Sequence, residues 1–132
     1  MRLTKAVDFA MRVLIRLAKD GQPQTMPVLS KELGISYHHL VKLVQKLRDM
    51  NLVRTIQGKQ GGVAFSGDAS VVTLRMVVDG FDGPTMLSGC LEDKLVDYCA
   101  LSGCCRLKET FARVQADINL RLDSVSLASL LG

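Results

Sequence analysis

The sequence contains no tryptophan and only two tyrosines and four phenylalanines among its 132 residues. Its core must therefore be built from aliphatic side chains, and a chain of this size often completes such a core by dimerising. Long apolar runs are also missing, since none approaches the roughly 20 residues that a membrane-spanning helix needs. The N-terminal stretch is charged every few residues and lacks the apolar centre of a secretory signal. These absences favour a cytoplasmic protein with no membrane partner.

Signatures of catalysis are scarce as well. No glycine-rich nucleotide loop follows a predicted strand, and the two histidines, His38 and His39, are neighbours in one predicted helix. No internal repeat or low-complexity segment interrupts the chain. We therefore predict that the chain is not an enzyme and that it forms one domain with an appendage.

Charge divides the chain into two unlike halves. Residues 1–62 carry eleven Lys and Arg against four Asp and Glu, whereas residues 63–132 carry six against nine. A basic half beside an acidic half predicts a polyanionic partner for the first half only.

Hydrophobic periodicity predicts three helices in the basic half. The first spans about residues 4–19 and the second residues 26–33, with Gly21 and Gly34 as their stop signals, and the third begins at the favourable N-cap Ser36. The predicted buried positions are Val7, Ala10, Met11, Leu14, Leu17 and Ala18 in the first helix and Leu40, Leu43, Val44 and Leu47 in the third. The short turn between the second and third helices predicts a helix-turn-helix unit.

A β-hairpin is predicted next, with strands near residues 52–56 and 63–65 and a glycine-rich tip that carries Lys59. Three helices followed by such a hairpin indicate a winged helix-turn-helix. The predicted fold class is mainly α with a small β-hairpin wing and a long C-terminal helix.

The acidic half is predicted to hold a short helix, a loop and a long helix. Thr73 is the expected N-cap of a helix through Val78 that ends at Gly80 or Gly83. The long helix of about 18 residues carries a narrow apolar seam formed by Leu107, Phe111, Val114, Ile118, Leu122 and Val125. This seam can pack on its own domain or on a second copy, and we favour the dimer because a small domain can cover little of it. The predicted organisation is a DNA-binding domain (1–66), a short helix with a cysteine-rich loop (67–104), and a dimerisation helix with a tail (105–132).

The third helix is the expected recognition helix, whose N-terminal residues approach base edges in the major groove. The candidates for base or near-base contacts are Ser36, Tyr37, His38 and His39, and those for phosphate contacts are Lys42 and Lys46. The alternatives are a surface metal site on the histidine pair and a merely solvated lysine face. Consecutive helical residues point about 100° apart, which disfavours shared ligation by the two histidines.

The wing supplies the other predicted DNA contacts. Its glycines Gly58, Gly61 and Gly62 would let the backbone approach the duplex closely, and Lys59 would reach the DNA backbone or the minor groove.

All four cysteines lie within one short stretch: Cys90, Cys99, Cys104 and Cys105. Cytoplasmic thiols stay reduced, so a metal or reactive site is favoured over a disulfide. Gaps of eight, four and zero intervening residues make a poor zinc pattern. Thiolates from an open loop can hold an iron–sulfur cluster, sometimes with another side chain replacing one of them. Spacing alone leaves an iron–sulfur cluster, zinc and a peroxide-type thiol switch open, with the cluster favoured.

Four segments resemble the Rrf-type family of iron–sulfur winged-helix repressors: Met1-RLTKAVDFAMRVLIRLA, Ile35-SYHHLVKLVQKLRDMNLV, Arg54-TIQGKQGGVAFS and Cys105-RLKETF. The resemblance covers essentially the whole chain and is strongest to the nitric-oxide-sensing NsrR branch. It implies that Cys90, Cys99 and Cys105 are thiolate ligands, because Cys105 directly precedes Arg-Leu-Lys and Cys104 does not. It also implies that Asp8 of the partner subunit is the fourth ligand.

Asp8 has an ordinary interpretation as well. It lies in the first turn of its helix, where a carboxylate suits the helix dipole, and Arg12 is its i,i+4 partner. Two departures from related branches favour NsrR. Iron–sulfur-assembly regulators have a histidine where this chain has Lys108, and a redox-sensing branch has Glu and His where this chain has Asp8 and Arg12.

The resemblance therefore implies a homodimeric repressor that binds palindromic double-stranded operator DNA and is released when nitric oxide attacks its cluster. A 4Fe–4S cluster is preferred, with 2Fe–2S as the alternative. The other functions left open are an iron-status or redox-sensing repressor of the same family, an electron-transfer protein, and a zinc-stabilised DNA-binding regulator.

Overall fold

The structure is a computed structural model that describes residues 2–92, 99–101 and 105–132. Its helices are α1 (Lys5–Asp20), α2 (Met26–Leu33), α3 (Tyr37–Asp49), α4 (Leu74–Asp82), α5 (Arg106–Ser124) and α6 (Leu127–Leu130), with a 3-10 turn η1 (Gly89–Leu91). The two strands β1 (Val53–Ile56) and β2 (Gly62–Phe65) pair antiparallel, from Val53 opposite Phe65 to Ile56 opposite Gly62. This arrangement confirms the predicted fold class. Within the described ranges, no helix is both long and apolar enough to cross a membrane.

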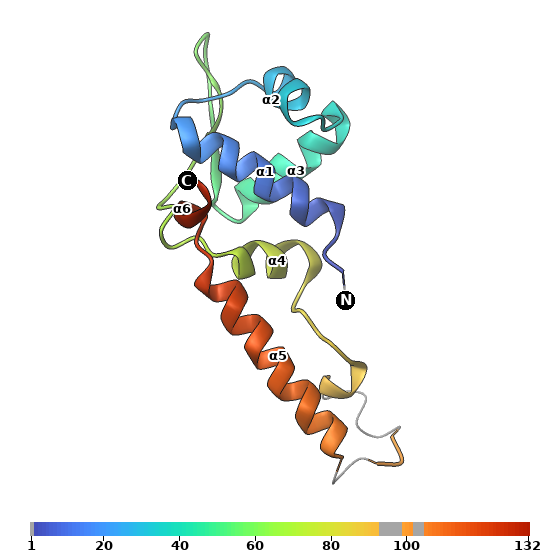
Figure 1. Ribbon diagram of the computed structural model, residues 1–132. Coiled ribbons are helices and arrows are strands. Elements are labelled where there is room, and N and C mark those ends of the chain that lie inside the picture. Colours follow the sequence, from blue (N-terminus) through green and yellow to red (C-terminus); the bar gives the residue numbers. More distant parts are fainter. Residues whose placement is uncertain (1, 93–98, 102–104) are drawn as a thin grey trace.

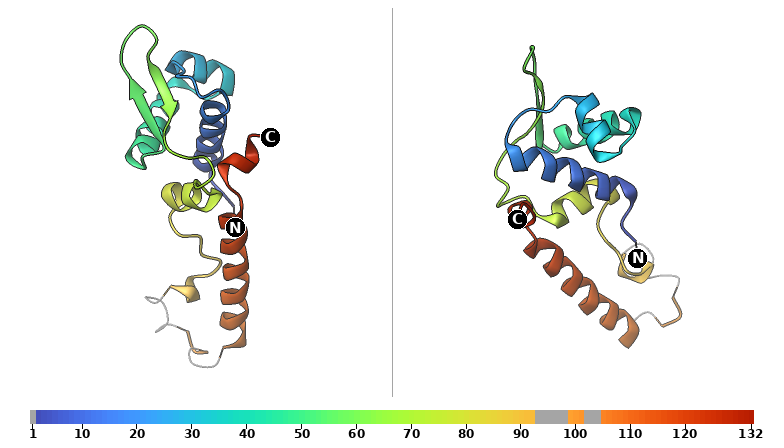
Figure 2. Two further views of the ribbon diagram at one scale, coloured as in Figure 1. Left: turned by 90° about the vertical axis from the view of Figure 1, so that its left-hand side faces the viewer. Right: turned by 45° about the horizontal axis from the view of Figure 1, so that its top comes forward.

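The molecule is elongated, with the first three helices and the hairpin at one end and α5 extending toward the other (Figure 1). The helices α1, α2 and α3 gather beside the hairpin, and α4 lies between this group and α5. Figure 2 shows in two further views that the tip of the hairpin and the start of α5 lie at opposite ends.

Local capping explains the bounds of the first three helices. The Ser36 hydroxyl accepts a hydrogen bond of 3.3 Å from the backbone N–H of His39, and Gly21 and Gly34 end their helices in the left-handed conformation at φ of 64° and 65°. Thr4 occupies the N-cap position of α1, but its hydroxyl donates to Asp82 at 2.5 Å instead of capping its own helix. A second bond of 3.1 Å joins the Thr4 N–H to the same carboxylate, so the start of α1 is tied to the end of α4.

The core beneath α1 and α3 is aliphatic, as the composition predicts. The buried residues of α3 are those predicted, Leu40, Leu43, Val44 and Leu47. In α1 the prediction missed Val13, which is fully buried, while the predicted Met11 and Ala18 are only partly buried. Each fully buried leucine or valine contributes about 1.5–3 kcal/mol relative to an exposed one.

A short backbone bridge fixes the base of the wing. Gln24 and Val63 exchange two hydrogen bonds of 2.8 Å, which add residue 24 to the edge of β2. Gly62 allows this pairing, because its φ is +146° and a Cβ atom there would lie 2.4 Å from the carbonyl oxygen of Gln24. The packing of the wing therefore gives Gly62 an intramolecular role.

The helix α4 ends at the second of its two predicted stops, Gly83. Thr73 caps it as expected, accepting from the N–H of Met76 at 3.3 Å, and the helix continues through Gly80 to Asp82. A Cβ atom on Gly80 would lie 2.3 Å from Cε of Met50, so the missing side chain lets α4 pack closely against the residue that follows α3.

The long helix α5 is held at its C-terminal end. Arg75 of α4 donates to Asp123 at 2.7 Å and to Asp79 at 3.3 Å, and the bond to Asp123 is the main cause that raises the pKa of Arg75. Val125, assigned to the seam of the helix by periodicity, is instead the residue that follows its end.

The helix α6 was not predicted. Its residue Leu127 is buried in the same core as α1 and α3, and its N–H donates to the carbonyl of Val72 at 2.7 Å. The N–H of Leu74 donates in turn to the carbonyl of Val125 at 2.8 Å. The chain thus returns from α5 to the core beneath α1 and α3.

Candidate DNA-reading surface and cysteine loop

One face of α3 borders a groove beside the wing. The groove has a volume of about 350 Å³ and is lined by Met26, Val41, Val44, Gln45, Arg48, Thr55 and Val63. Val41, Gln45 and Arg48 are exposed along α3, and Thr55 is exposed on β1. Winged-helix proteins bind duplex DNA with the exposed face of such a helix and with the wing beside it.

The predicted contact residues of α3 lie on two sides of the helix. Tyr37, His38 and Lys42 are exposed, whereas His39 is half-buried with its ring 5.3 Å from that of Phe9 on α1, edge to face. The predicted contact Ser36 is exposed and caps the helix.

Lys46 lies on the same side of α3 as His39, two turns further along the helix. Its Nζ lies 5.9 Å from the centre of the Phe81 ring on α4. His39 thus contacts α1, the helix that carries Asp8. Lys46 contacts α4, the helix that precedes the cysteine loop. Their contacts with DNA stay a prediction.

Sequence reasoning did not select Val41 and Gln45. Both follow Tyr37 at successive steps of four residues, and both are exposed. This i,i+4 spacing from the first residue of the helix was the signal that could have found them.

The tip of the wing presents the predicted residue Lys59, which is exposed. Gly58 beside it has open space where a Cβ atom would be, at φ of +106°. At Gly61 a Cβ atom would lie 2.1 Å from the carbonyl oxygen of Ile56, so this glycine, like Gly62, is needed for the hairpin itself.

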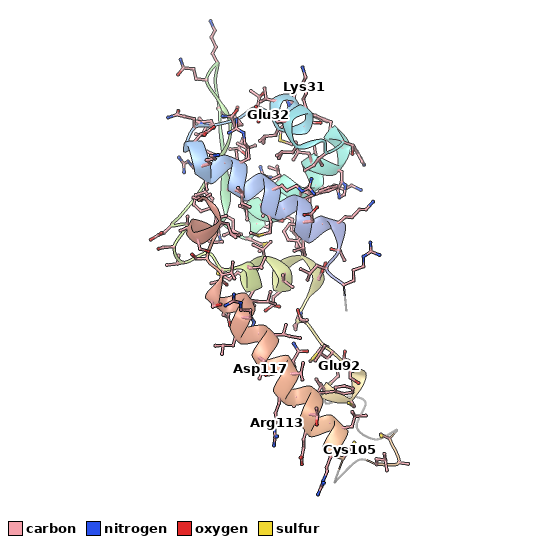
Figure 3. All side chains as sticks on the ribbon, in the orientation of Figure 1. Lys31, Glu32, Glu92, Cys105, Arg113 and Asp117 are labelled. Atoms are coloured by element: carbon pink, nitrogen blue, oxygen red, sulfur yellow. The ribbon has the colours of Figure 1, made fainter. Side chains whose placement is uncertain are left out.

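Replacing Lys59 with alanine is expected to weaken binding to all duplexes by a similar factor. Each neutralised phosphate adds about 0.9 to the slope of log affinity against log salt concentration, so the slope should fall by about that amount. Fluorescence anisotropy between low and physiological salt measures it. Arg113→Ala is the matched control, because Arg113 lies on α5 far from the wing (Figure 3). An unchanged slope for Lys59→Ala would show that this lysine contacts no phosphate.

The predicted cysteine ligands lie between α4 and the start of α5. Cys90 is half-buried in η1 with its Sγ 3.2 Å from Oγ of Ser88, and Cys99 is exposed. Cys105 is half-buried at the N-cap position of α5, where its side chain makes no capping hydrogen bond. Cys104 lies outside the described residues. Figure 3 shows Cys105 at the end of α5 farthest from the wing.

The three described cysteines are free thiols. Thiolates are soft ligands that suit iron–sulfur clusters and zinc, so the donor set fits a cluster chemically. Among residues 2–92, 99–101 and 105–132, no three His, Cys, Asp or Glu side chains are placed together to hold a metal ion.

The predicted fourth ligand, Asp8, lies on α1. Its carboxylate pairs with Arg12 at 2.9 Å, which confirms the expected i,i+4 ion pair, and its side chain is 54% exposed. The guanidinium of Arg12 lies 5.8 Å from the ring centre of Phe9. Asp8 is therefore connected through Arg12 and Phe9 to His39 of α3.

The three helices, the hairpin and the exposed face of α3 define a winged-helix DNA-binding protein. The chain belongs to the Rrf2 family, whose sequence profile carries the description iron-dependent transcriptional regulator and matches residues 3–132.

Solved structures share this fold over nearly the whole chain. CymR (YrzC), the global cysteine regulator of B. subtilis, is 23% identical with a TM-score of 0.81, covering 99% of this chain and 96% of that one. The oxidized form of Staphylococcus aureus CymR is 20% identical with a TM-score of 0.78 and the same coverage. IscR of T. potens is 19% identical with a TM-score of 0.77, covering 99% of this chain and 86% of that one. The family and the similar structures are thus those of transcription regulators.

Proposed function

We propose that the chain is a homodimeric repressor whose affinity for a palindromic operator depends on an iron–sulfur cluster and is lowered by nitric oxide. The observation that carries this proposal is the set of three free thiols, Cys90, Cys99 and Cys105, on one segment of a chain whose family is described as iron-dependent. The resemblance of the sequence to the nitric-oxide-sensing branch supports the choice of signal. When bound, a cluster would supply iron that reacts with nitric oxide.

Asp8 is the residue that we propose as the fourth ligand, donated to the cluster site of the partner subunit. Its exposed carboxylate is accessible to a second chain, and Arg12 is its ion-pair partner at 2.9 Å. As a ligand it would share its charge with the site and loosen its attraction to Arg12. Ligation of the cluster by Asp8 would then depend on the relative position of the two subunits.

The described contacts connect the end of α4, which leads to the cysteines, with α3 in two successive steps through α1. Asp82, the last residue of α4, holds the first residues of α1 through Thr4. Phe9, on α1, holds the ring of His39 near the start of α3. A displacement of the cysteine segment or of Asp8 would therefore move the N-terminal end of the helix that reads the DNA.

Anaerobic purification followed by metal analysis tests the proposal. We expect a brown protein that contains iron and sulfide, with visible charge-transfer bands. An operator selected from random duplexes should bind about 10- to 100-fold more tightly to the intact protein than to the cluster-free or nitric-oxide-treated protein, a usual range for coupled sites. Equal affinity in the three states would refute the sensing mechanism, and colourless protein with one zinc would indicate a structural metal.

A metal-free thiol switch is the second candidate, favoured by the exposure of Cys99. A thiol of this kind is accessible to peroxide. Colourless, metal-free protein whose operator affinity changes with peroxide and is restored by a thiol reductant would support it over the cluster.

A further inference from the structure

Val41 is an apolar residue on a polar surface. It is 41% exposed, and its exposed neighbours along α3 are Tyr37, His38, Lys42 and Gln45. A single exposed valine is ordinary on a protein surface. Its position singles it out, because it lies one turn after the first residue of α3 and forms part of the wall of the groove beside the wing.

The chemistry of valine limits what it can read in a major groove. Its side chain has no hydrogen-bond donor or acceptor, so it cannot pair with the N and O atoms that base edges present. The apolar feature of those edges is the C5-methyl group of thymine. Placed against any other base edge, valine would remove polar atoms from water without replacing their hydrogen bonds, which is unfavourable.

The stiffness of valine suits this role. A β-branched side chain in a helix strongly prefers one χ1 rotamer, so little conformational entropy is lost when it packs against a methyl group. Val41 lies about 6 Å along the helix axis from both Tyr37 and Gln45, at 1.5 Å per residue. Its neighbours can therefore contact the adjacent base pairs while Val41 reads one.

We infer that Val41 determines specificity by packing against the C5-methyl group of one thymine in each half-site. This inference rests on the DNA-binding part of the proposed function and is independent of the cluster and of nitric oxide.

Deoxyuridine scanning tests the inference directly, since dU differs from dT only by the missing methyl group. An operator is first selected from random duplexes with the anaerobically purified full-length protein. Each thymine of a half-site, together with its symmetry mate, is then replaced by dU. At one position we expect the affinity to fall about fourfold per half-site, the change for losing one buried methyl group. The Val41→Ala protein should bind the unmodified operator more weakly and should not distinguish dT from dU at that position.

Gln45→Ala is the matched control, because Gln45 is exposed one turn further along the same face. It should keep the sensitivity to dU at the Val41 position, and thermal melting should give similar Tm values for both variants and the unaltered protein. The inference is overturned if no thymine methyl contributes, or if Val41→Ala retains the same dU sensitivity. Failure to select any duplex would overturn it together with DNA binding itself, whereas normal selection without a Val41-dependent methyl effect would overturn the inference alone.

Discussion

Replacing Val114 with glutamate is expected to convert the proposed dimer into a monomer and to lower operator affinity by about a hundredfold or more, since a monomer contacts one half-site instead of two. Val114 is 42% exposed on α5, and Leu107, two turns before it, is 58% exposed. The rest of the predicted seam is covered only in part, because Phe111, Ile118 and Leu122 are half-buried. A carboxylate buried among such side chains would lose its hydration without gaining a partner.

Sedimentation equilibrium and operator titration measure the two effects. Val71→Glu is the matched control, because Val71 is 63% exposed and lies before α4, outside the seam. It should remain dimeric and bind DNA normally. A Val114→Glu protein that stays dimeric with full affinity would show that α5 does not form the dimer interface through this seam.

Replacing Cys105 with serine is expected to abolish cluster binding, with iron and sulfide near the background level and the nitric oxide response lost. Serine replaces a soft thiolate by a hydroxyl that binds iron poorly. The substitution should not harm the fold, because Cys105 occupies the N-cap position of α5, where serine is a favoured residue and could add up to about 1 kcal/mol of stability. Loss of iron in a protein that melts no lower can then be assigned to the missing ligand.

Cys104→Ser supplies the comparison, since the two cysteines are adjacent and the resemblance assigns only Cys105 to the cluster. The Cys104 variant should retain iron, colour and regulated DNA binding. The opposite result, with iron lost only from the Cys104 variant, would exchange their roles. Iron lost from neither variant would remove both from the ligand set.

Local signals were sufficient to predict much of the fold. Ser36, Gly21 and Gly34 mark helix ends through interactions within a few residues, so α2 and the start of α3 match their predicted bounds. The pair Asp8 and Arg12 is equally local and forms as predicted.

The missed features depend on partners distant in sequence. The helix α6 has only four residues, and it is stabilised by the burial of Leu127 and by backbone hydrogen bonds from Leu127 to Val72 and from Ala128 to Ala69. The close approach of Met50 to Gly80 of α4 is another contact between residues distant in sequence. Periodicity alone could not show these contacts.

The same reason applies to the candidate site. Periodicity identifies the outer side of α3, but it does not tell which outer residues meet another helix. The rings of Phe9 and Phe81 give His39 and Lys46 intramolecular contacts, and Val41 and Gln45 are left beside the wing. For a ligand shared between subunits, as proposed for Asp8, the sequence of one chain contains both Asp8 and the cysteines. It does not show how close Asp8 of one subunit lies to the cysteines of the other.

The attachment of α5 makes it a lever. Its 19 residues span about 28 Å, with Asp123 fixed to Arg75 at one end and Cys105 at the other. A tilt of about 5° around the fixed end moves the Cys105 end by about 2.5 Å over this length. Conversely, a displacement of a few ångströms at Cys105 would correspond to a rotation of α5 by a few degrees at the end that adjoins the winged helix. In the proposed sensor, such a rotation would connect the cysteines with the winged helix over the length of α5.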